Sequence, residues 1–334
     1  MCAQVIPWNA PILMAAIKFA NALCCGNTLI LKPAELACLS SLRMAELLQE
    51  TDLPPGVVNV LPGFGTTAGA ALALHPDVDK IAFTGSTITG KSIVQAATSN
   101  LKKVTLELGG KSPNVIFPDA DLDRAIEAAV RTFCLNSGQV CSAGTRLFVH
   151  ESIHDEVAER LTRIAATYKV GDPLEADTKL GPLISAKQRD RVMSYIDSGQ
   201  AAGATLRMGA TPWTRGGYFV EPTVFDCVTN DMRIAREEIF GPVLSIIPFK
   251  DEDDAVFKGN DSTYGLSAAV WTRDVARAHK VARALKAGRV WINTYGETDP
   301  VMPFGGFKQS GWGRELGQAS IDAYTQVKAV MLRM

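Results

Sequence analysis

The chain has 334 residues, a length that favours about two domains. With 47% hydrophobic and 21% charged residues it has the composition of a globular protein with a full core, and its net charge of −1 gives no electrostatic basis for binding nucleic acid or an anionic membrane surface. No apolar run approaches the roughly 20 residues that a membrane-spanning helix needs, and no signal-peptide pattern opens the chain. We therefore expect neither a membrane nor a nucleic acid as partner.

The first third of the chain alternates short β-rich runs with helical stretches. The pattern predicts strands at 2–6, 28–31, 57–61, 80–83 and 104–106, with helices at 12–24, 40–50, 67–74 and 86–97 between them. Strands that alternate with helices in this way are typical of a parallel, doubly wound sheet. Such a sheet binds ligands at the carboxyl ends of its strands.

A second alternating segment begins near residue 113. Strands are predicted at 114–117, 147–149, 243–248, 268–271 and 289–293, and helices near 119 and at 153–168, 186–202 and 275–287. A Gly- and Pro-rich loop covers 295–317, and 324–334 reads as a strand. We therefore expect an α/β fold: a doubly wound, Rossmann-like domain at 1–109, to which the chain returns around 310–323, a second α/β domain at 110–309, and a C-terminal strand at 324–334.

Cysteine usage bears on location and on metals. Seven cysteines, an odd number, are scattered apart from the adjacent Cys24 and Cys25, which argues against a disulfide framework and predicts a reducing, cytoplasmic location. His150 and His154 form a close pair without partner ligands in the sequence around them, so we expect no metal site.

Two glycine-rich turns follow predicted strands. The turn with Gly65 and Gly69 has the wrong spacing for the dinucleotide fingerprint. The turn Thr84-Gly85-Ser86 opens a helix after a strand, where free backbone N–H groups and the helix dipole can bind phosphate. A plain capping turn is the alternative interpretation of the second motif.

Three further motifs contain groups suited to catalysis. Cys141 stands in the small-residue run 138–144, Glu107 in the run 106–112, and Asn9 in the run 6–9. A thiol, a carboxylate and an amide in separate Gly- or Pro-punctuated segments suggest a nucleophile, a base and an oxyanion donor. Taken alone, a cysteine such as Cys141 is more often a small buried hydrophobic residue than a nucleophile, and only its glycine-flanked setting and the accompanying motifs favour the nucleophile.

Together these strings resemble the aldehyde dehydrogenase superfamily, from about residue 3 to the last residue. The resemblance implies NAD-dependent oxidation of a small aldehyde to an acid. Cys141 would attack the aldehyde, the Asn9 side chain and the Cys141 backbone N–H would stabilise the oxyanion, and Glu107 would activate the water that hydrolyses the thioester. Because members that transfer the acyl group to coenzyme A usually lack this glutamate, Glu107 indicates the hydrolytic class.

The resemblance also assigns cofactor roles. The Gly85-Ser86 pair would contact the pyrophosphate, Lys32 and Glu35 the adenine ribose, and Glu238 the nicotinamide ribose. Because the Glu35 carboxylate would repel a 2′-phosphate, NAD is favoured over NADP. The expected cofactor-binding residues are Ile6, Pro7, Trp8, Lys32, Glu35, Gly65, Gly69, Thr84, Gly85, Ser86, Leu108, Gln188, Glu238 and Phe240.

The expected substrate pocket is apolar. Leu13, Met14 and Ile17 lie on one face of the first predicted helix. By resemblance that face lines the tunnel to the thiol, which suits an apolar aliphatic or aromatic aldehyde, although spacing alone fits an ordinary core stripe equally well. The further residues expected in the pocket are Leu135, Val140 and Ser142.

The chain also departs from the family. Its first residue stands almost at the first strand of the dinucleotide domain, whereas family chains carry a further N-terminal region whose hairpin pairs with the C-terminal strand in the oligomer. We therefore expect a homo-oligomer with a compromised interface and an exposed apolar edge at 324–334. Two other functions stay open: a cysteine acyl hydrolase or transferase that works without a dinucleotide, and an inactive, non-catalytic relative.

Overall fold

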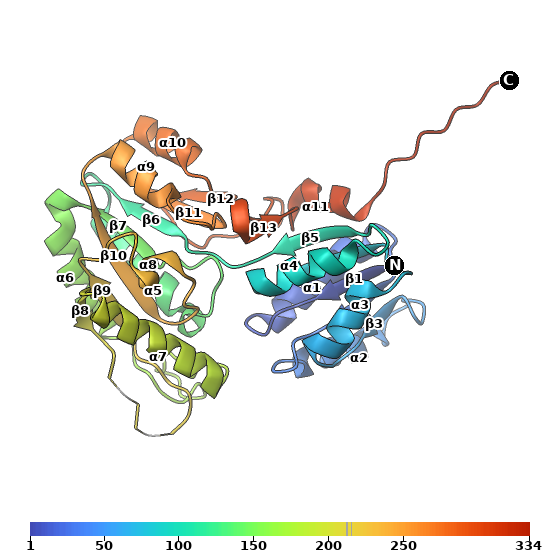
Figure 1. Cartoon of the computed structure of the whole chain (residues 1–334), viewed down its shortest axis with the longest axis horizontal. Helices are drawn as coiled ribbons and strands as arrows, with labels where there is room; N and C mark the ends of the chain where they lie inside the picture. The colour runs from blue at the N-terminus through green and yellow to red at the C-terminus, as the bar shows by residue number, and fades with distance from the viewer. Residues whose placement is uncertain (212, 215) are drawn as a thin grey trace. The chain divides into compact units, whose positions relative to one another are not determined.

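The computed structural model describes residues 1–211, 213–214 and 216–334. Its contacts divide the chain into two compact units (Figure 1). The first unit comprises Met1–Leu108, Thr298–Gly305 and Gly311–Met334, and the second comprises Gly109–Glu297 and Gly306–Ser310.

The first unit is built on a six-stranded sheet in the part of the chain described, with the order β13-β5-β4-β1-β2-β3. Neighbouring strands are parallel except β13, which runs antiparallel to β5. The strands are β1 (Cys2–Val5), β2 (Leu29–Lys32), β3 (Val58–Val60), β4 (Lys80–Thr84), β5 (Lys103–Glu107) and β13 (Gly311–Trp312). The helices are α1 (Pro11–Leu23), α2 (Leu39–Leu48), α3 (Ala70–Leu74), α4 (Thr87–Ala97) and α11 (Gly317–Tyr324).

Both faces of this sheet are covered, as the continuous burial of β1 and β4 requires. Side chains alternate between the faces, so Ala3 and Val5 share one apolar cluster with Leu72 of α3 and Ile93 of α4. The opposite face packs against Ala15, Phe19 and Ala22 of α1 and Tyr324 of α11. The predicted doubly wound parallel sheet is confirmed.

The second unit contains a seven-stranded sheet among its described residues, with the order β12-β11-β6-β7-β10-β9-β8. Its strands are parallel except β8, which is antiparallel to β9. The strands are β6 (Pro113–Ile116), β7 (Arg146–His150), β8 (Thr205–Met208), β9 (Thr223–Asp226), β10 (Val243–Phe249), β11 (Ser267–Trp271) and β12 (Arg289–Ile292). The helices are α5 (Leu122–Cys134), α6 (His154–Ala165), α7 (Ala186–Ala201), α8 (Arg233–Arg236), α9 (Glu252–Asn260) and α10 (Val275–Ala284).

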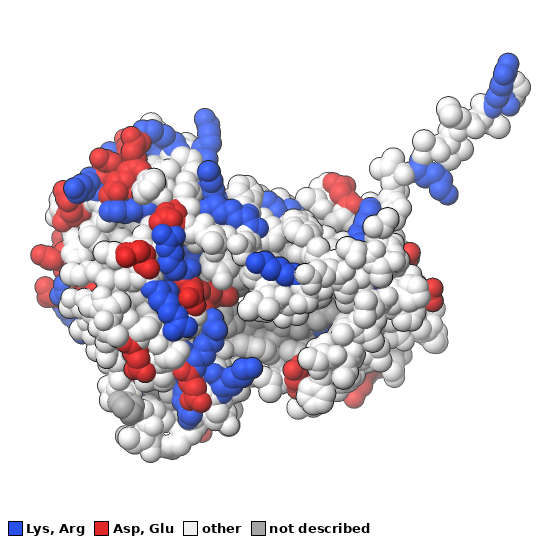
Figure 2. All heavy atoms as spheres, in the orientation of Figure 1, with Lys and Arg blue, Asp and Glu red and all other residues white. Residues whose placement is uncertain are grey.

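Helix starts in the second unit follow from local side-chain chemistry. Asp121, Ser185, Asp251 and Asp274 each accept a hydrogen bond from a backbone N–H in the first turn of α5, α7, α9 and α10. Helices α5 and α6 bury one face of the sheet, and α7 and α10 bury the other. Figure 2 shows Lys, Arg, Asp and Glu side chains interspersed over the visible face of this unit.

The predicted C-terminal strand is wrong. Helix α11 ends at Tyr324, and residues 325–334 have neither helix nor strand structure and are exposed. A strand is stabilised by a hydrogen-bonded neighbour, and no described part of the chain pairs with this segment. Among the residues that the structure describes, no helix combines the length and apolar character needed to cross a membrane.

Candidate active site

The carboxyl ends of the parallel strands in the first unit carry most of the predicted cofactor-binding residues. The 6–9 segment follows β1, Lys32 ends β2, Thr84 ends β4 and Glu107 ends β5. The Ile6 N–H donates to the Lys32 carbonyl over 3.1 Å, and Thr84 is the registered neighbour of Glu107. The sheet therefore gathers side chains from distant segments along one edge.

Lys32 and Glu35 form an ion pair at this edge. The buried Lys32 Nζ lies 3.2 Å from Oε2 of the more exposed Glu35. A hydrogen bond from its own backbone N–H and the neighbouring ammonium keep the pKa of Glu35 below its usual value, against the effect of burial. Glu35 is thus held as a charged acceptor.

The start of α4 has the features of an anion site. Ser86 caps the helix, accepting the Thr89 N–H over 3.2 Å. A Cβ on Gly85 would lie 2.5 Å from the Phe83 ring, so a side chain there would clash. The Thr84 Oγ1 is buried and has no hydrogen-bond partner among the described residues. These groups leave helix N–H groups and a hydroxyl for a ligand.

Gly65 and Gly69 lie in a helical turn, Gly65–Gly69, that precedes α3. Nothing lies within 4 Å of a Cβ built at either glycine. Packing inside the chain therefore does not explain the absence of side chains here, whereas a ligand that approaches the backbone closely would.

Glu107 is 3% exposed. Its side chain lies against Gly305, where a Cβ would stand 2.7 Å from Oε1, and Gly305 has a φ of +159°. The Gly85 N–H donates to the Glu107 carbonyl over 3.0 Å. The carboxylate is therefore held in a narrow space between a strand end and a glycine turn.

Lys18 and Glu315 are functional candidates that sequence reasoning missed. Both are buried, and their side chains form an ion pair. Burial lowers the pKa of Lys18 to about 7, and the charge of Glu107 acts in the opposite direction. The sequence held a sign of this pair, because Lys18 stands between the small apolar residues Ala15 and Ala22 on the buried face of α1, where a lysine is unusual.

In the second unit, Cys141 follows a tight turn that ends α5. Asn136, Ser137 and Gly138 all have positive φ, and a Cβ on Gly138 would lie 2.1 Å from the Gly241 backbone. A Cβ on Gly110 would lie 2.4 Å from the Cys141 carbonyl oxygen. The thiol is therefore positioned by close backbone packing on both sides of its loop.

The loop is also fixed beyond the thiol. The Tyr295 hydroxyl donates to the Ser142 carbonyl over 2.7 Å, and its ring leaves no space for a side chain on Gly144. Cys141 is partly exposed, as a nucleophile that meets substrate needs to be.

Glu238 and Phe240 are held by side chains of α7. Gln188 Nε2 donates to the Phe240 carbonyl over 2.8 Å, and Arg191 Nη2 donates to the Glu238 carbonyl over 2.8 Å. The Gly110 N–H donates to Glu238 Oε1 over 3.1 Å. Burial raises the pKa of Glu238 to about 7, while this N–H and the charges of Lys111 and Arg191 lower it.

The aldehyde dehydrogenase family model matches residues 1–330 of the chain. The chain belongs to the aldehyde dehydrogenase family. The family prediction made from the motifs is therefore confirmed.

Curated relatives match the whole chain. An aldehyde dehydrogenase of Davidiella tassiana is 53% identical over 335 residues, covering 100% of this chain and 68% of the relative. Human retinal dehydrogenase 2 is 53% identical, with 100% of this chain and 65% of the relative covered. The chain thus spans about two-thirds of the length of these relatives.

Solved structures of family members have the same fold. The NAD⁺ complex of an aldehyde dehydrogenase from Bacillus cereus has a TM-score of 0.97 and 50% identity, covering 98% of this chain and 67% of that one. An indole-3-acetaldehyde dehydrogenase of P. syringae, solved with NAD⁺ and IAA, has a TM-score of 0.98 and 47% identity, covering 100% and 68%.

The residues predicted for the substrate pocket of this aldehyde dehydrogenase lie mostly outside the cores. Leu13 and Leu135 are exposed, and Ile17, Val140 and Ser142 are half-buried. Met14 differs, because it packs partly against the α1 cluster. The buried stripe of α1 consists instead of Ala15, Lys18, Phe19 and Ala22, so an ordinary core stripe does not account for Leu13 and Ile17.

Proposed function

We propose that the chain oxidises an aldehyde to a carboxylic acid with NAD, through a covalent intermediate on Cys141. The observation that carries this proposal is the setting of Glu107, a carboxylate buried at the carboxyl end of β5 near the charge of Lys18, in a chain that matches the aldehyde dehydrogenase family over residues 1–330. A buried carboxylate at a ligand-binding sheet edge is a candidate general base.

The first unit suits the adenosine and pyrophosphate parts of NAD. The α4 N-terminus with Ser86 suits the pyrophosphate, and the charged Glu35 suits two ribose hydroxyls as hydrogen-bond acceptor. The same charge disfavours the 2′-phosphate of NADP. Solved relatives carry NAD⁺ in their complexes, and bound NAD accepts the hydride that leaves the substrate.

The second unit suits the nicotinamide half. Glu238, fixed on Gly110 and by Arg191, offers a carboxylate for the nicotinamide ribose. Phe240 has a positive φ of 60°, and Gln188 holds its carbonyl, so the backbone at this residue is constrained. Fixed donors and acceptors of this kind orient a cofactor for transfer.

In the proposed reaction the Cys141 thiolate adds to the aldehyde carbon. The Asn9 side-chain amide and the Cys141 backbone N–H stabilise the negative oxygen of the thiohemiacetal. Loss of hydride converts this intermediate to a thioester. Glu107 then removes a proton from the attacking water, and the thioester is hydrolysed to the free acid.

An apolar aldehyde fits the residues proposed to line the pocket. The exposed side chains of Leu13 and Leu135 carry no charge, and Val140 flanks the thiol in sequence. Such a lining favours an aliphatic or aromatic substrate over a charged one.

Assembly of copies through the exposed apolar 325–334 segment is part of the same proposal, because an exposed apolar chain segment can pair with another chain.

The test is NADH formation by the purified chain with NAD and a panel of apolar and charged aldehydes. Oxidation that is lost in Cys141→Ala while NAD binding persists supports the proposal. The buried Cys134 supplies a matched control, because Cys134→Ala removes a thiol that is 1% exposed. Hydrolysis of activated esters without any aldehyde oxidation would favour the acyl hydrolase instead, and NAD binding without either activity would favour an inactive relative.

A further inference from the structure

Lys111 is a buried lysine that the proposed reaction does not use. It is 1% exposed, and its Nζ has no hydrogen-bond partner among the residues that the structure describes. An ammonium group without an acceptor costs several kcal/mol when it leaves water, so its position calls for an explanation.

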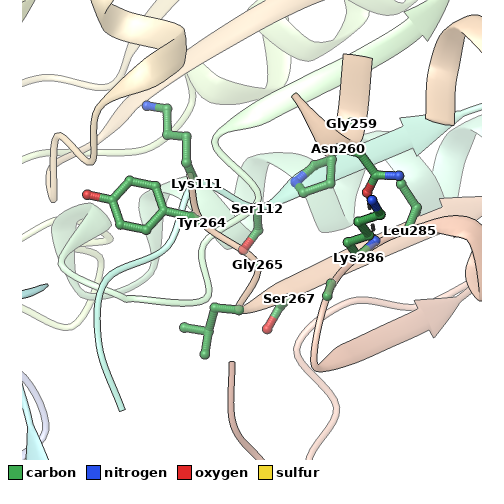
Figure 3. A pocket seen from close by; sticks show the side chains of 12 residues that line it. Lys111, Ser112, Gly259, Asn260, Tyr264, Gly265, Ser267, Leu285 and Lys286 are labelled. Carbon is green, nitrogen blue, oxygen red and sulfur yellow. Dashed lines mark hydrogen bonds between the residues drawn. The ribbon is translucent and has the colours of Figure 1, made fainter. Parts of the chain in front are cut away.

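The small cavity beside Lys111 does not explain the position of its ammonium group. This cavity, of about 10 Å³, is lined by Ser112, Ser267, Lys286 and neighbouring residues and has room for about one water. Figure 3 shows the Lys111 ammonium directed away from Lys286 and Ser267, toward the side on which the Tyr264 hydroxyl lies. The Lys111 ammonium therefore points away from the part of the cavity lined by Lys286 and Ser267.

The acidic group bound to the backbone next to Lys111 is Glu238. The Gly110 N–H, one residue before Lys111, donates to Glu238 Oε1. The nearby Glu237 is occupied, since its carboxylate accepts from Tyr195 over 2.6 Å and lies 3.5 Å from Arg233.

The remaining cation near Lys111 is also occupied. The buried Arg146 guanidinium donates to the Lys111 and Gly259 carbonyls over 2.9 and 2.8 Å. Burial, and then the positive charge of Arg146, lower the pKa of Lys111 to about 7, whereas the charges of Glu238 and Glu237 raise it. Glu238 Oε2 accepts no hydrogen bond from the residues described.

We propose that Lys111 is a positioning residue for the cofactor, whose buried ammonium keeps the Glu238 carboxylate charged and available to the ribose hydroxyls of NAD. The inference rests on the proposed role of Glu238. A carboxylate that accepts two ribose O–H groups must be ionised. Without Lys111, burial would favour the protonated form of Glu238, which is a weaker acceptor.

The test measures NAD affinity by calorimetry between pH 6 and 9, in the Cys141→Ala background so that turnover plays no part. Affinity should fall as the pH drops through about 7, because Glu238 gains a proton there. Lys111→Met should weaken binding at pH 7 by roughly five- to tenfold and leave it close to the parent at pH 9, since one pKa unit changes an equilibrium tenfold. Lys250→Met, which removes an exposed lysine of the same unit, should change neither value.

A double-mutant cycle separates this role from a structural one. Glu238→Gln cannot ionise, so its weaker binding should be independent of pH, and Lys111→Met should add no further loss in that background. Further weakening there, or an unchanged pH profile in Lys111→Met, would overturn the inference.

Lys111→Arg keeps a positive charge that does not titrate in this range, and it serves if Lys111→Met does not fold. Its NAD affinity at and below pH 7 should stay close to the parent's, because both side chains are positively charged there, and a loss of fivefold or more would refute the proposal. If the Cys141→Ala chain binds no NAD at any pH, the proposed function fails and the inference fails with it.

Discussion

The buried Lys18 ammonium forms an ion pair with Glu315, and both side chains lie in the first unit. The charge of Glu107, in the same unit, raises the pKa of Lys18 against the effect of burial. Gln4 supports this arrangement, because its Nε2 donates to the Lys18 carbonyl over 2.7 Å and also to the Tyr324 hydroxyl. Gln4 of β1 therefore joins Lys18 of α1 to Tyr324 of α11.

Removing one partner of this pair should destabilise the protein strongly. Lys18→Met leaves the Glu315 carboxylate buried without its cation, a change that typically costs about 3–5 kcal/mol. Chemical denaturation monitored by fluorescence would measure it, and Lys18→Met/Glu315→Leu should recover part of the loss. Arg43→Ala, which breaks an exposed pair with Glu46, should cost under about 1 kcal/mol; equal losses in the two single variants would contradict the buried character of the Lys18 pair.

Glu107→Gln should separate the two halves of the proposed reaction. The amide cannot accept a proton from water, so the thioester should form with a burst of NADH and then accumulate. Rapid-mixing absorbance at limiting enzyme would show a burst close to one NADH per active site, followed by a steady rate reduced at least tenfold. Glu127→Gln, on the exposed side of α5, is the matched control. Loss of burst and steady rate together would argue against a role confined to hydrolysis.

Glu35→Ser should shift cofactor preference toward NADP. The carboxylate carries its charge at neutral pH, since its pKa is below the usual value, and it would repel a 2′-phosphate. Relative kcat/KM for NADP over NAD should rise severalfold, whereas Glu46→Ser, an exposed carboxylate of α2, should leave the ratio unchanged. An unaltered ratio in Glu35→Ser would remove the basis for preferring NAD on this ground.

The 325–334 segment should promote association between copies. Val327, Met331 and Met334 are almost fully exposed, and this part of the chain pairs with no described strand. Sedimentation at several concentrations should show self-association of the whole chain that is weakened when the last ten residues are deleted. A monomer at every concentration in both forms would show that the exposed segment does not drive assembly.

The strand–helix alternation was enough to predict which edge of the first sheet bears Ile6, Lys32, Thr84 and Glu107, because the hydrophobic pattern sets parallel order and direction. The 324–334 strand could not be judged in the same way. Its apolar residues suit a strand, but pairing is a property of two segments, and no described segment lies beside this one.

Contacts between distant residues were beyond sequence reasoning. Glu238 meets the Gly110 N–H across a separation of 128 residues, and Lys18 meets Glu315 across 297. Spacing along the chain carries no signal of such pairs. The burial of Lys18, which only the folded structure reveals, is what points to its pairing with Glu315.

The backbone contact between Gly138 and Gly241 links the thiol loop to the segment that carries Phe240. A side chain on Gly138 would overlap the Gly241 carbonyl, so neither loop can shift alone. Mutations that adapt the enzyme to new aldehydes would therefore be tolerated at exposed positions such as Leu13 and Leu135 far more readily than at this junction. This contact therefore keeps the distance between the Cys141 loop and the Phe240 segment constant, whatever changes at the exposed positions.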